Sequence, residues 1–79
     1  MIKVKLVGPF AKFMPERDNE GFWMVEGAEG KTVAEFLDTT PVKEHYMNYS
    51  VIINNKASDQ SYVLRDGDSL KAIPIFKAG

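Results

Sequence analysis

The chain has 79 residues, of which 44% are hydrophobic and 27% are charged, proportions typical of one small globular domain. Ten basic and eleven acidic residues give a formal charge of -1, which does not favour binding to nucleic acid or to an anionic membrane surface. The sequence contains no cysteine and a single histidine, His45, which excludes a disulfide framework, a thiolate nucleophile and a histidine metal cluster. Lysines interrupt the first apolar run, so we expect neither a signal peptide nor a membrane span, and we expect a cytoplasmic location.

The first part of the chain predicts two strands. Residues 2–6 alternate apolar and basic side chains, which is the pattern of a strand with one buried face. A long polar connection follows, with one helical turn predicted over residues 10–14. The apolar run 22–25 predicts a second strand, antiparallel to the first, and Gly27 and Gly30 then turn the chain.

A short helix is predicted from Thr32 onward. The Thr32 hydroxyl can accept from the amide of Glu35 while the Glu35 carboxylate reaches back to the amide of Thr32, which forms a capping box. Pro41 closes the helix, because it has no N–H to donate and its ring disfavours continuation. The residues of its apolar stripe are Val33, Phe36 and Leu37.

The second half of the chain predicts a strand, a turn and a further strand. Residues 42–49 have a mixed pattern, residues 51–53 predict a strand, and residues 54–56 predict a turn. Residues 62–64 predict a short extended piece before a tight turn at Asp66-Gly67, where two carboxylates around a glycine favour a turn over a cation site.

The last strand is predicted over residues 69–75. Pro74 cannot donate to a ladder of hydrogen bonds, so the end of this strand is expected to lie outside the fully paired part of the sheet. The order of elements predicts an α+β fold in which one helix crosses a mixed sheet of four to five strands. If the two end strands lie side by side at the centre, the sheet is a β-grasp. The predicted core residues are Ile2, Val4, Leu6, Phe36, Leu37, Ile53 and Leu70.

Taken together, these segments resemble the MoaD/ThiS family of ubiquitin-like sulfur carriers, and the MoaD side of it more closely. The resemblance covers nearly the whole chain, and its pieces are individually weak but fairly specific in their order and spacing. It implies one ubiquitin-like β-grasp domain over residues 1–79, with a flexible tail at 76–79. The matching segments are 2–6, 10–13, 32–37, 51–55 and 64–70, followed by Ile73-Pro74 and the terminal glycine.

The resemblance implies chemistry performed on the tail by other proteins. An E1-like adenylyltransferase of the MoeB/ThiF type would adenylate the carboxylate of Gly79 with ATP, and a sulfur donor would convert it to a thiocarboxylate. A mixed anhydride with AMP supplies the leaving group that a bare carboxylate lacks. The carrier itself would be no enzyme and would bind no cofactor or metal. Its sulfur would pass to the large subunit of molybdopterin synthase or to another acceptor, for molybdenum or tungsten cofactor synthesis.

The tail departs from the family pattern at Ala78, where the family usually has glycine. Alanine cannot easily adopt the positive φ angles that glycine adopts, and a channel shaped for two glycines could reject its methyl group. Three explanations are open: a partner adapted to the Ala-Gly end, a precursor that has been trimmed, or a paralogue that has lost the chemistry.

The residues before the glycine are candidates for partner binding. Ile73, Ile75 and Phe76 predict either core packing or an apolar patch that docks a partner near the tail. Lys77, with Lys71, predicts attraction to an acidic partner surface. Besides the molybdopterin carrier, three functions remain open: a thiamin-type sulfur carrier, a ubiquitin-like modifier conjugated through Gly79, and a β-grasp interaction module with an inactive tail.

Overall fold

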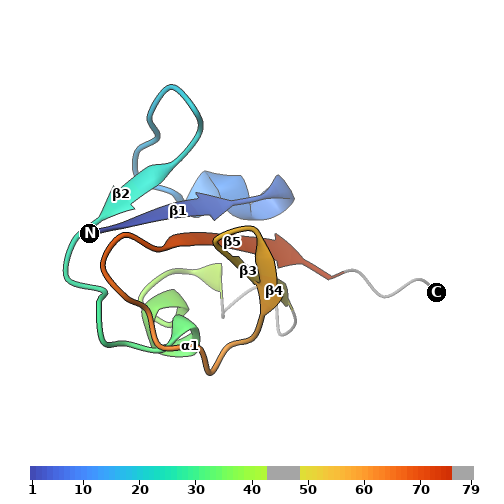
Figure 1. The fold of residues 1–79 in the computed structure, drawn as a ribbon. Helices are drawn as coiled ribbons and strands as arrows, with labels where there is room; N and C mark the ends of the chain where they lie inside the picture. Colours follow the sequence, from blue (N-terminus) through green and yellow to red (C-terminus); the bar gives the residue numbers. More distant parts are fainter. Residues whose placement is uncertain (43–48, 76–79) are drawn as a thin grey trace.

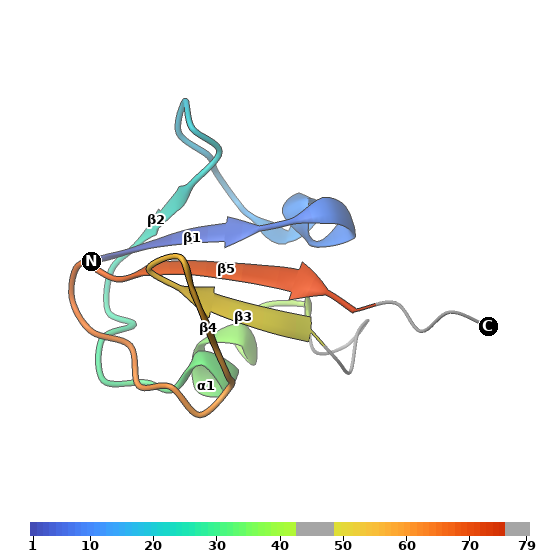
Figure 2. The same cartoon turned by 45° about the vertical axis from the view of Figure 1, so that its right-hand side comes forward.

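In the part of the chain that the structure describes, a mixed β-sheet with the short α-helix α1 across one face forms the framework (Figures 1 and 2). The structure is a computed structural model, and it describes residues 1–42 and 49–75. In this part of the chain the elements follow in the order β1 (Ile2–Leu6), the 3-10 helix η1 (Gly8–Phe13), β2 (Trp23–Val25), α1 (Val33–Leu37), β3 (Tyr49–Ile53), β4 (Lys56–Ser58) and β5 (Ser69–Pro74).

The sheet has five strands in the order β2-β1-β5-β3-β4. The first and last strands, β1 and β5, are parallel neighbours at its centre, with Val4 opposite Leu70 and Leu6 opposite Ala72. All other neighbouring strands are antiparallel. Because its end strands meet in this way and α1 crosses one face, the sheet is a β-grasp, which confirms the predicted fold class.

Among the described residues, the core is formed by buried side chains of the sheet, of α1 and of η1. All seven residues predicted for the core are at most 5% exposed. Phe10 of η1 is fully buried. Its ring packs edge to face against the ring of Tyr49, with 6.3 Å between the ring centroids. The helical turn predicted over residues 10–14 is therefore present as η1, and it supplies the largest fully buried side chain of the described core.

Helix α1 begins as predicted but ends earlier than predicted. The amide of Glu35 donates to the Thr32 hydroxyl at 3.1 Å, and the amide of Thr32 donates to the Glu35 carboxylate at 2.9 Å. The helix ends at Leu37, before Pro41. Its last carbonyls accept from the hydroxyls of Thr39 and Thr40, each at 2.6 Å, and such local side-chain bonds compete with helix continuation.

The strand β4 was not predicted from the sequence, which placed its first residue in a turn. The turn consists of Asn54 and Asn55 alone, with φ angles of 52° and 68°, as a tight two-residue hairpin turn requires. Lys56 already pairs with Ile53. The segment Lys56–Ser58 escaped prediction because none of its residues favours a strand, so only its cross-strand partners define it.

The extended piece predicted over residues 62–64 lies outside the sheet. Val63 forms an isolated bridge with Thr32, next to the start of α1. The amide of Leu64 donates to the carbonyl of Lys31 at 2.8 Å, and the amide of Val33 donates to the carbonyl of Tyr62 at 2.9 Å. This segment therefore fastens the N-terminus of the helix to the chain that leads into β5.

Asp68, at the entrance to β5, is a buried hydrogen-bonding centre. It is 6% exposed, and its carboxylate accepts from the side-chain amide of Asn54, the hydroxyl of Tyr62 and the backbone amide of Arg65 at 2.8 to 2.9 Å. Burial acts to raise the pKa of this carboxyl, but the three hydrogen bonds outweigh it and hold the pKa below its ordinary value. The turn at Asp66-Gly67 is confirmed, with Gly67 at a φ of 88°.

We predict that Asp68→Asn lowers the free energy of unfolding by about 1–3 kcal/mol, because the amide cannot accept all three bonds and leaves a buried donor unpaired. The stability that the carboxylate provides is present above its unfolded pKa of about 3.9 and is lost as the pH falls through the lower folded pKa. Urea unfolding at pH 7 and below pH 4 measures both effects, and the gap between the two proteins should narrow in acid.

The matched control is Asp66→Asn in the same turn. The Asp66 side chain is 82% exposed and contacts only the amino group of Met1 among its described partners, so its loss should matter much less. Equal destabilisation by both substitutions, or a pH-independent difference between Asp68→Asn and the parent, would contradict the assignment of Asp68 as the centre of this network.

Candidate functional site

The last strand divides its side chains between the core and the opposite face of the sheet. Leu70, Ala72 and Pro74 are buried, whereas Lys71 and Ile73 are partly exposed and Ile75, just after the strand, is 49% exposed. The alternation is therefore regular through Pro74. The sequence allowed Ile73 and Ile75 either to pack in the core or to form an exposed apolar patch. In the structure both side chains lie on the side away from the core.

At Pro74 the strand β5 has only one neighbouring strand instead of two. The pairing of β5 with β1 ends at Ala72, while the pairing with β3 continues to Pro74, opposite Tyr49. The end of β5 is therefore outside the fully paired part of the sheet, as its proline predicts. The arrow of β5 ends at the periphery of the molecule in both orientations (Figures 1 and 2).

The remaining predicted site residues, Phe76, Lys77, Ala78 and Gly79, lie outside the described residues. The geometry given for the site therefore ends at Ile75, whose exposed side chain marks where the chain leaves the sheet.

The face of the sheet turned away from α1, here called the outer face, has a distinctive composition. Cross-strand pairing aligns Lys5 with Lys71, Lys71 with Ile52 and Ile52 with Ala57 in one row, and Ile73 with Ser50 in the next. No acidic residue occupies an outward position of the described strands. The outward residues are Lys3, Lys5, Met24, Ser50, Ile52, Ala57, Ser69, Lys71 and Ile73.

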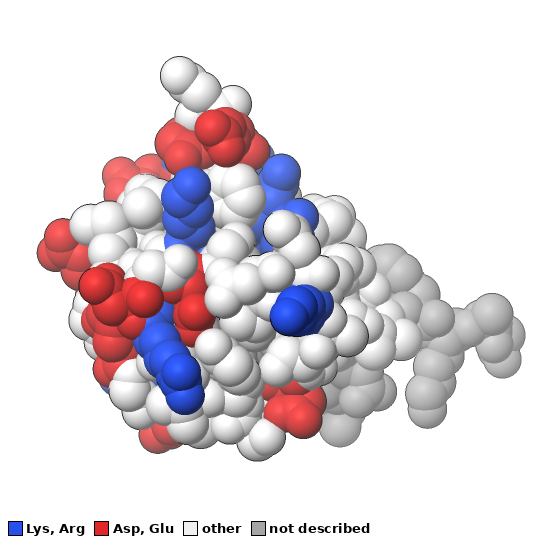
Figure 3. All heavy atoms as spheres, in the orientation of Figure 1, with Lys and Arg blue, Asp and Glu red and all other residues white. Residues whose placement is uncertain are grey.

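Figure 3 shows how charge is distributed over one side of the molecule. Most of the acidic side chains in this view lie in its left and upper parts, and one acidic group lies near the lower edge. The rest of the described surface in this view is largely uncharged, with separate basic side chains.

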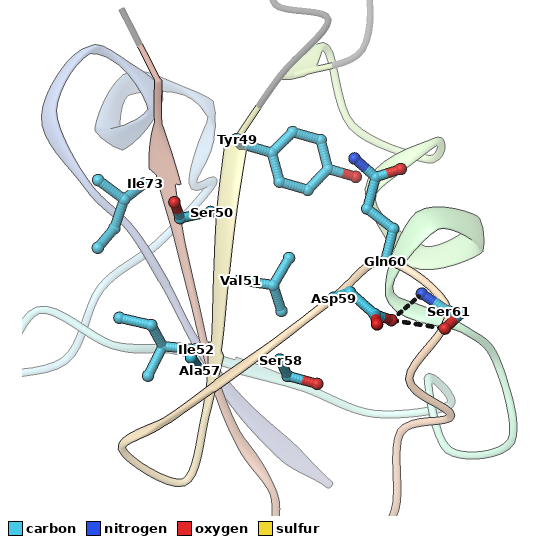
Figure 4. Close-up of a pocket in the computed structure, with 10 residues that line it drawn as sticks. All are labelled: Tyr49, Ser50, Val51, Ile52, Ala57, Ser58, Asp59, Gln60, Ser61 and Ile73. Atoms are coloured by element: carbon cyan, nitrogen blue, oxygen red, sulfur yellow. Dashed lines mark hydrogen bonds between the residues drawn. The ribbon is translucent and has the colours of Figure 1, made fainter.

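A groove of about 730 Å³ borders the first half of β3, where β4 leaves it. Figure 4 shows Tyr49 and Val51 on one side of β3 and Ile52 and Ile73 on the other. The carboxylate of Asp59 in this groove accepts from the hydroxyl and amide of Ser61, and these bonds lower its pKa. Asp59 is thus engaged in its own turn.

The described residues contain no group of three or more His, Cys, Asp or Glu residues that could hold a metal ion. Within the same ranges, no helix is long and apolar enough to cross a membrane. Of the predicted site residues, the structure describes Ile73 and Ile75, and Ile73 lies opposite Ser50 on the outer face.

Comparison with solved structures identifies the same fold in two small proteins. One is a chain in the protein–protein complex of subunits 1 and 2 of molybdopterin-converting factor from Helicobacter pylori 26695, at 20% identity and a TM-score of 0.60, covering 99% of this chain and 97% of that one. The other is SAMP1 from Haloferax volcanii, at 23% identity and a TM-score of 0.58, covering 99% and 98%. No protein-family model matches the chain, and no curated protein matches it.

These likenesses extend over the full length of both chains, and they confirm the fold that the resemblance to MoaD/ThiS proteins implied. Lys5 and Ile52, which share the outer face with Lys71, were not among the residues predicted from the sequence. The alternation of each strand indicates an outward position, but only the strand order shows that both residues lie beside Lys71.

We predict that Ile75→Ser leaves the free energy of unfolding within about 0.5 kcal/mol of the parent, as expected for an exposed side chain. Leu70→Ala on the buried face of the same strand should cost about 2–5 kcal/mol, because it opens a cavity in the core. Chemical denaturation of both variants tests this, and a loss of several kcal/mol for Ile75→Ser would mean that Ile75 packs in the core.

Proposed function

We propose that the protein is a sulfur carrier whose C-terminal Gly79 carboxylate is activated by a partner enzyme. The observation that carries the proposal is the β-grasp fold itself, in which the central strand β5 leads directly into the Ala78-Gly79 end. The fold likeness to a chain of the two-subunit molybdopterin-converting factor supports a role in molybdopterin synthesis. The MoaD/ThiS-like segments of the sequence support the same assignment.

The proposed chemistry proceeds in two steps. A Gly79 carboxylate oxygen attacks the α-phosphorus of ATP and pyrophosphate leaves, which gives an acyl-adenylate. Hydrosulfide delivered by the sulfur donor then attacks the carbonyl carbon, AMP leaves and a proton is released, which gives the thiocarboxylate. The activating enzyme supplies the nucleotide site and the electrostatic stabilisation, so the carrier contributes position and access rather than an acid or base.

The proposed partners follow from this chemistry. An E1-like adenylyltransferase would bind ATP and hold the tail, and the large subunit of molybdopterin synthase would receive the sulfur. The carrier would be the substrate of the first enzyme and the small subunit of the second. It would act in the cytoplasm, and it would hold no cofactor of its own.

Intact mass of the protein isolated from its native cell tests the proposed carrier. We predict a fraction heavier by the difference between one sulfur and one oxygen, located on Gly79 by fragmentation of the terminal peptide. A Gly79–lysine isopeptide to another protein would indicate a ubiquitin-like modifier instead, and a persistently unmodified carboxylate would count against both functions.

Deleting Gly79 provides a test in vitro. The shortened chain should unfold at the same denaturant concentration as the parent, since Gly79 lies five residues beyond the end of β5 in the sequence, but should support no ATP–pyrophosphate exchange with the adenylyltransferase from the same genome. Unchanged exchange would show that another group is activated.

Ala78 allows a test of how closely the partner is matched to this tail. If the partner's channel accommodates the Ala-Gly end, Ala78→Gly should change the KM for exchange by less than about fivefold, because burial of one methyl group contributes about 1 kcal/mol. Ala78→Val should raise it much more, because the β-branched side chain is bulkier. If Ala78→Gly lowered this KM more than tenfold, the Ala-Gly tail would be poorly suited to activation.

A further inference from the structure

The two edge strands of the sheet differ in how they are protected. The strand β4 begins with Lys56, and a lysine on an edge opposes pairing with another chain. The strand β2 at the other edge consists of Trp23, Met24 and Val25, with no charged residue and no proline. An apolar edge of this kind is a template to which a further strand can add.

The backbone of Met24 is directed away from the sheet. The amide of Lys3 donates to the carbonyl of Asp68 at 2.9 Å, so the backbone groups of Lys3 face the β5 side and not β2. Lys3 is the partner of Met24 in the antiparallel register, and residues opposite each other in such a pair exchange either both hydrogen bonds or neither. The N–H and C=O of Met24 therefore point off the free edge of β2.

The available edge begins at Met24, because the residue two positions before it is already bonded. The amide of Phe22 donates to the Asp18 carboxylate at 2.9 Å, and the Phe22 carbonyl accepts from the Asp18 amide at 2.7 Å. Alternation gives Glu26 the same direction as Met24. Glu26 is exposed, and in the described part of the chain it takes part in no ion pair and in no hydrogen bond outside the strand ladders.

These two positions are complementary to themselves in a second copy. A twofold axis through Val25 sets Met24 of each copy opposite Glu26 of the other, and both pairs can exchange N–H···O=C bonds. The two Val25 side chains then meet on the face that carries α1. Trp23 lies opposite Gly27 of the second copy, where no heavy atom comes within 4 Å of the position that a Cβ would take. Gly27 therefore leaves room for the indole ring.

Charge complementarity favours a second copy as the occupant of this edge. Met24 lies between Lys3 and Glu26 of the second copy, which places this lysine and this glutamate in one row of the outer face, with their Cα atoms about 10 Å apart. The ammonium group of Lys3 lies over the Phe22 ring, 5.5 Å from its centroid, and forms no ion pair among the described residues. Two such contacts form, one on each side of the axis, and no like charges lie opposite each other.

We propose that two copies of the chain form a dimer by antiparallel pairing of their β2 strands, with Met24 opposite Glu26 and Val25 on the twofold axis. The two sheets then become one continuous sheet. The end of β5 stays open in both copies, because β5 is separated from β2 by β1. The inference is independent of the proposed function, since it rests on β2 and its neighbours.

Sedimentation equilibrium at protein concentrations from about 10 μM to about 1 mM tests the proposal, because so small a contact gives a weak dimer. The weight-average mass should rise from that of one chain toward that of two and no further, since a twofold pairing closes on itself. Amide hydrogen exchange measured by NMR gives the location. Exchange of the Met24 amide should slow at least about threefold as the dimer forms, while exchange of the Ala57 amide should not change.

Met24→Pro and Ala57→Pro are a matched pair of variants. Proline removes an N–H, which a sheet tolerates at an edge position whose N–H faces solvent. Ala57 is the equivalent position of β4: its partner Ile52 faces β5, as does Asn54, whose amide donates to the carbonyl of Ser69 at 2.9 Å. Met24→Pro should abolish the rise in mass, and Ala57→Pro should leave it unchanged.

Exchange of the two charges tests the same contact with the backbone intact. Lys3→Glu and Glu26→Lys should each weaken the dimer about tenfold, because both contacts change from attraction to repulsion. The double variant Lys3→Glu/Glu26→Lys should recover most of the affinity of the parent, since opposite charges face each other again. These differences should shrink as salt is raised.

A chain that stays monomeric throughout this concentration range would overturn the proposal. A dimer in which the Met24 amide exchanges at the rate of the monomer, or one that Ala57→Pro abolishes as fully as Met24→Pro, would place the contact elsewhere and contradict it. Growth beyond two chains would mean an open assembly instead of a closed pair. Failure of the double charge variant to recover affinity would refute the contact between Lys3 and Glu26, even if Met24→Pro folds poorly.

Discussion

The parallel pairing of β1 with β5 is the contact on which the rest of the protein depends. It joins residues that are more than sixty positions apart in the sequence and places Val4 beside Leu70, both without measurable exposure, at the middle of the sheet. Every other strand adds to this pair from outside. Because the chain between the two strands must leave and return, it is available to carry α1 across one face, and no described helix covers the other face.

Asp68 secures this arrangement at one end. Its carboxylate binds groups from the β3–β4 turn, from the segment that holds the start of α1 and from its own turn, just before β5 enters the sheet. A buried carboxylate is stable only when such partners are complete. The network therefore joins the entrance of β5 to the β3–β4 turn and to the segment beside the start of α1.

Much of this fold is visible in the sequence because its strongest elements are locally encoded. The alternation in β1, the capping box of Thr32 and Glu35 and the turn at Gly67 each have a local physical cause, and all are present in the structure. The strand β4 has no such cause, since Lys-Ala-Ser becomes a strand only through its pairing with β3. Helix α1 stops early because nearby threonine hydroxyls donate to its last carbonyls. The sequence-based prediction relied on Pro41 and did not include these hydrogen bonds.

The candidate site was predictable to a similar degree. Residues next to the tail could be named from their position in the chain, and the alternation of β5 determines which of them face outward. The meeting of Lys5, Lys71 and Ile52 could not be named, because it depends on which strands are neighbours and in what register. Such information arises only from the packing of the whole chain.

The central position of β5 also has a consequence for the synthesis of the protein. Until this strand has been made, β1 has only β2 to pair with and the sheet has no centre, so most of the core cannot close. Pairing between such distant segments is among the slower steps of folding. The outer face and the exit of the chain at Ile75 therefore come into being together, in a single late event, and a chain broken off before β5 has neither.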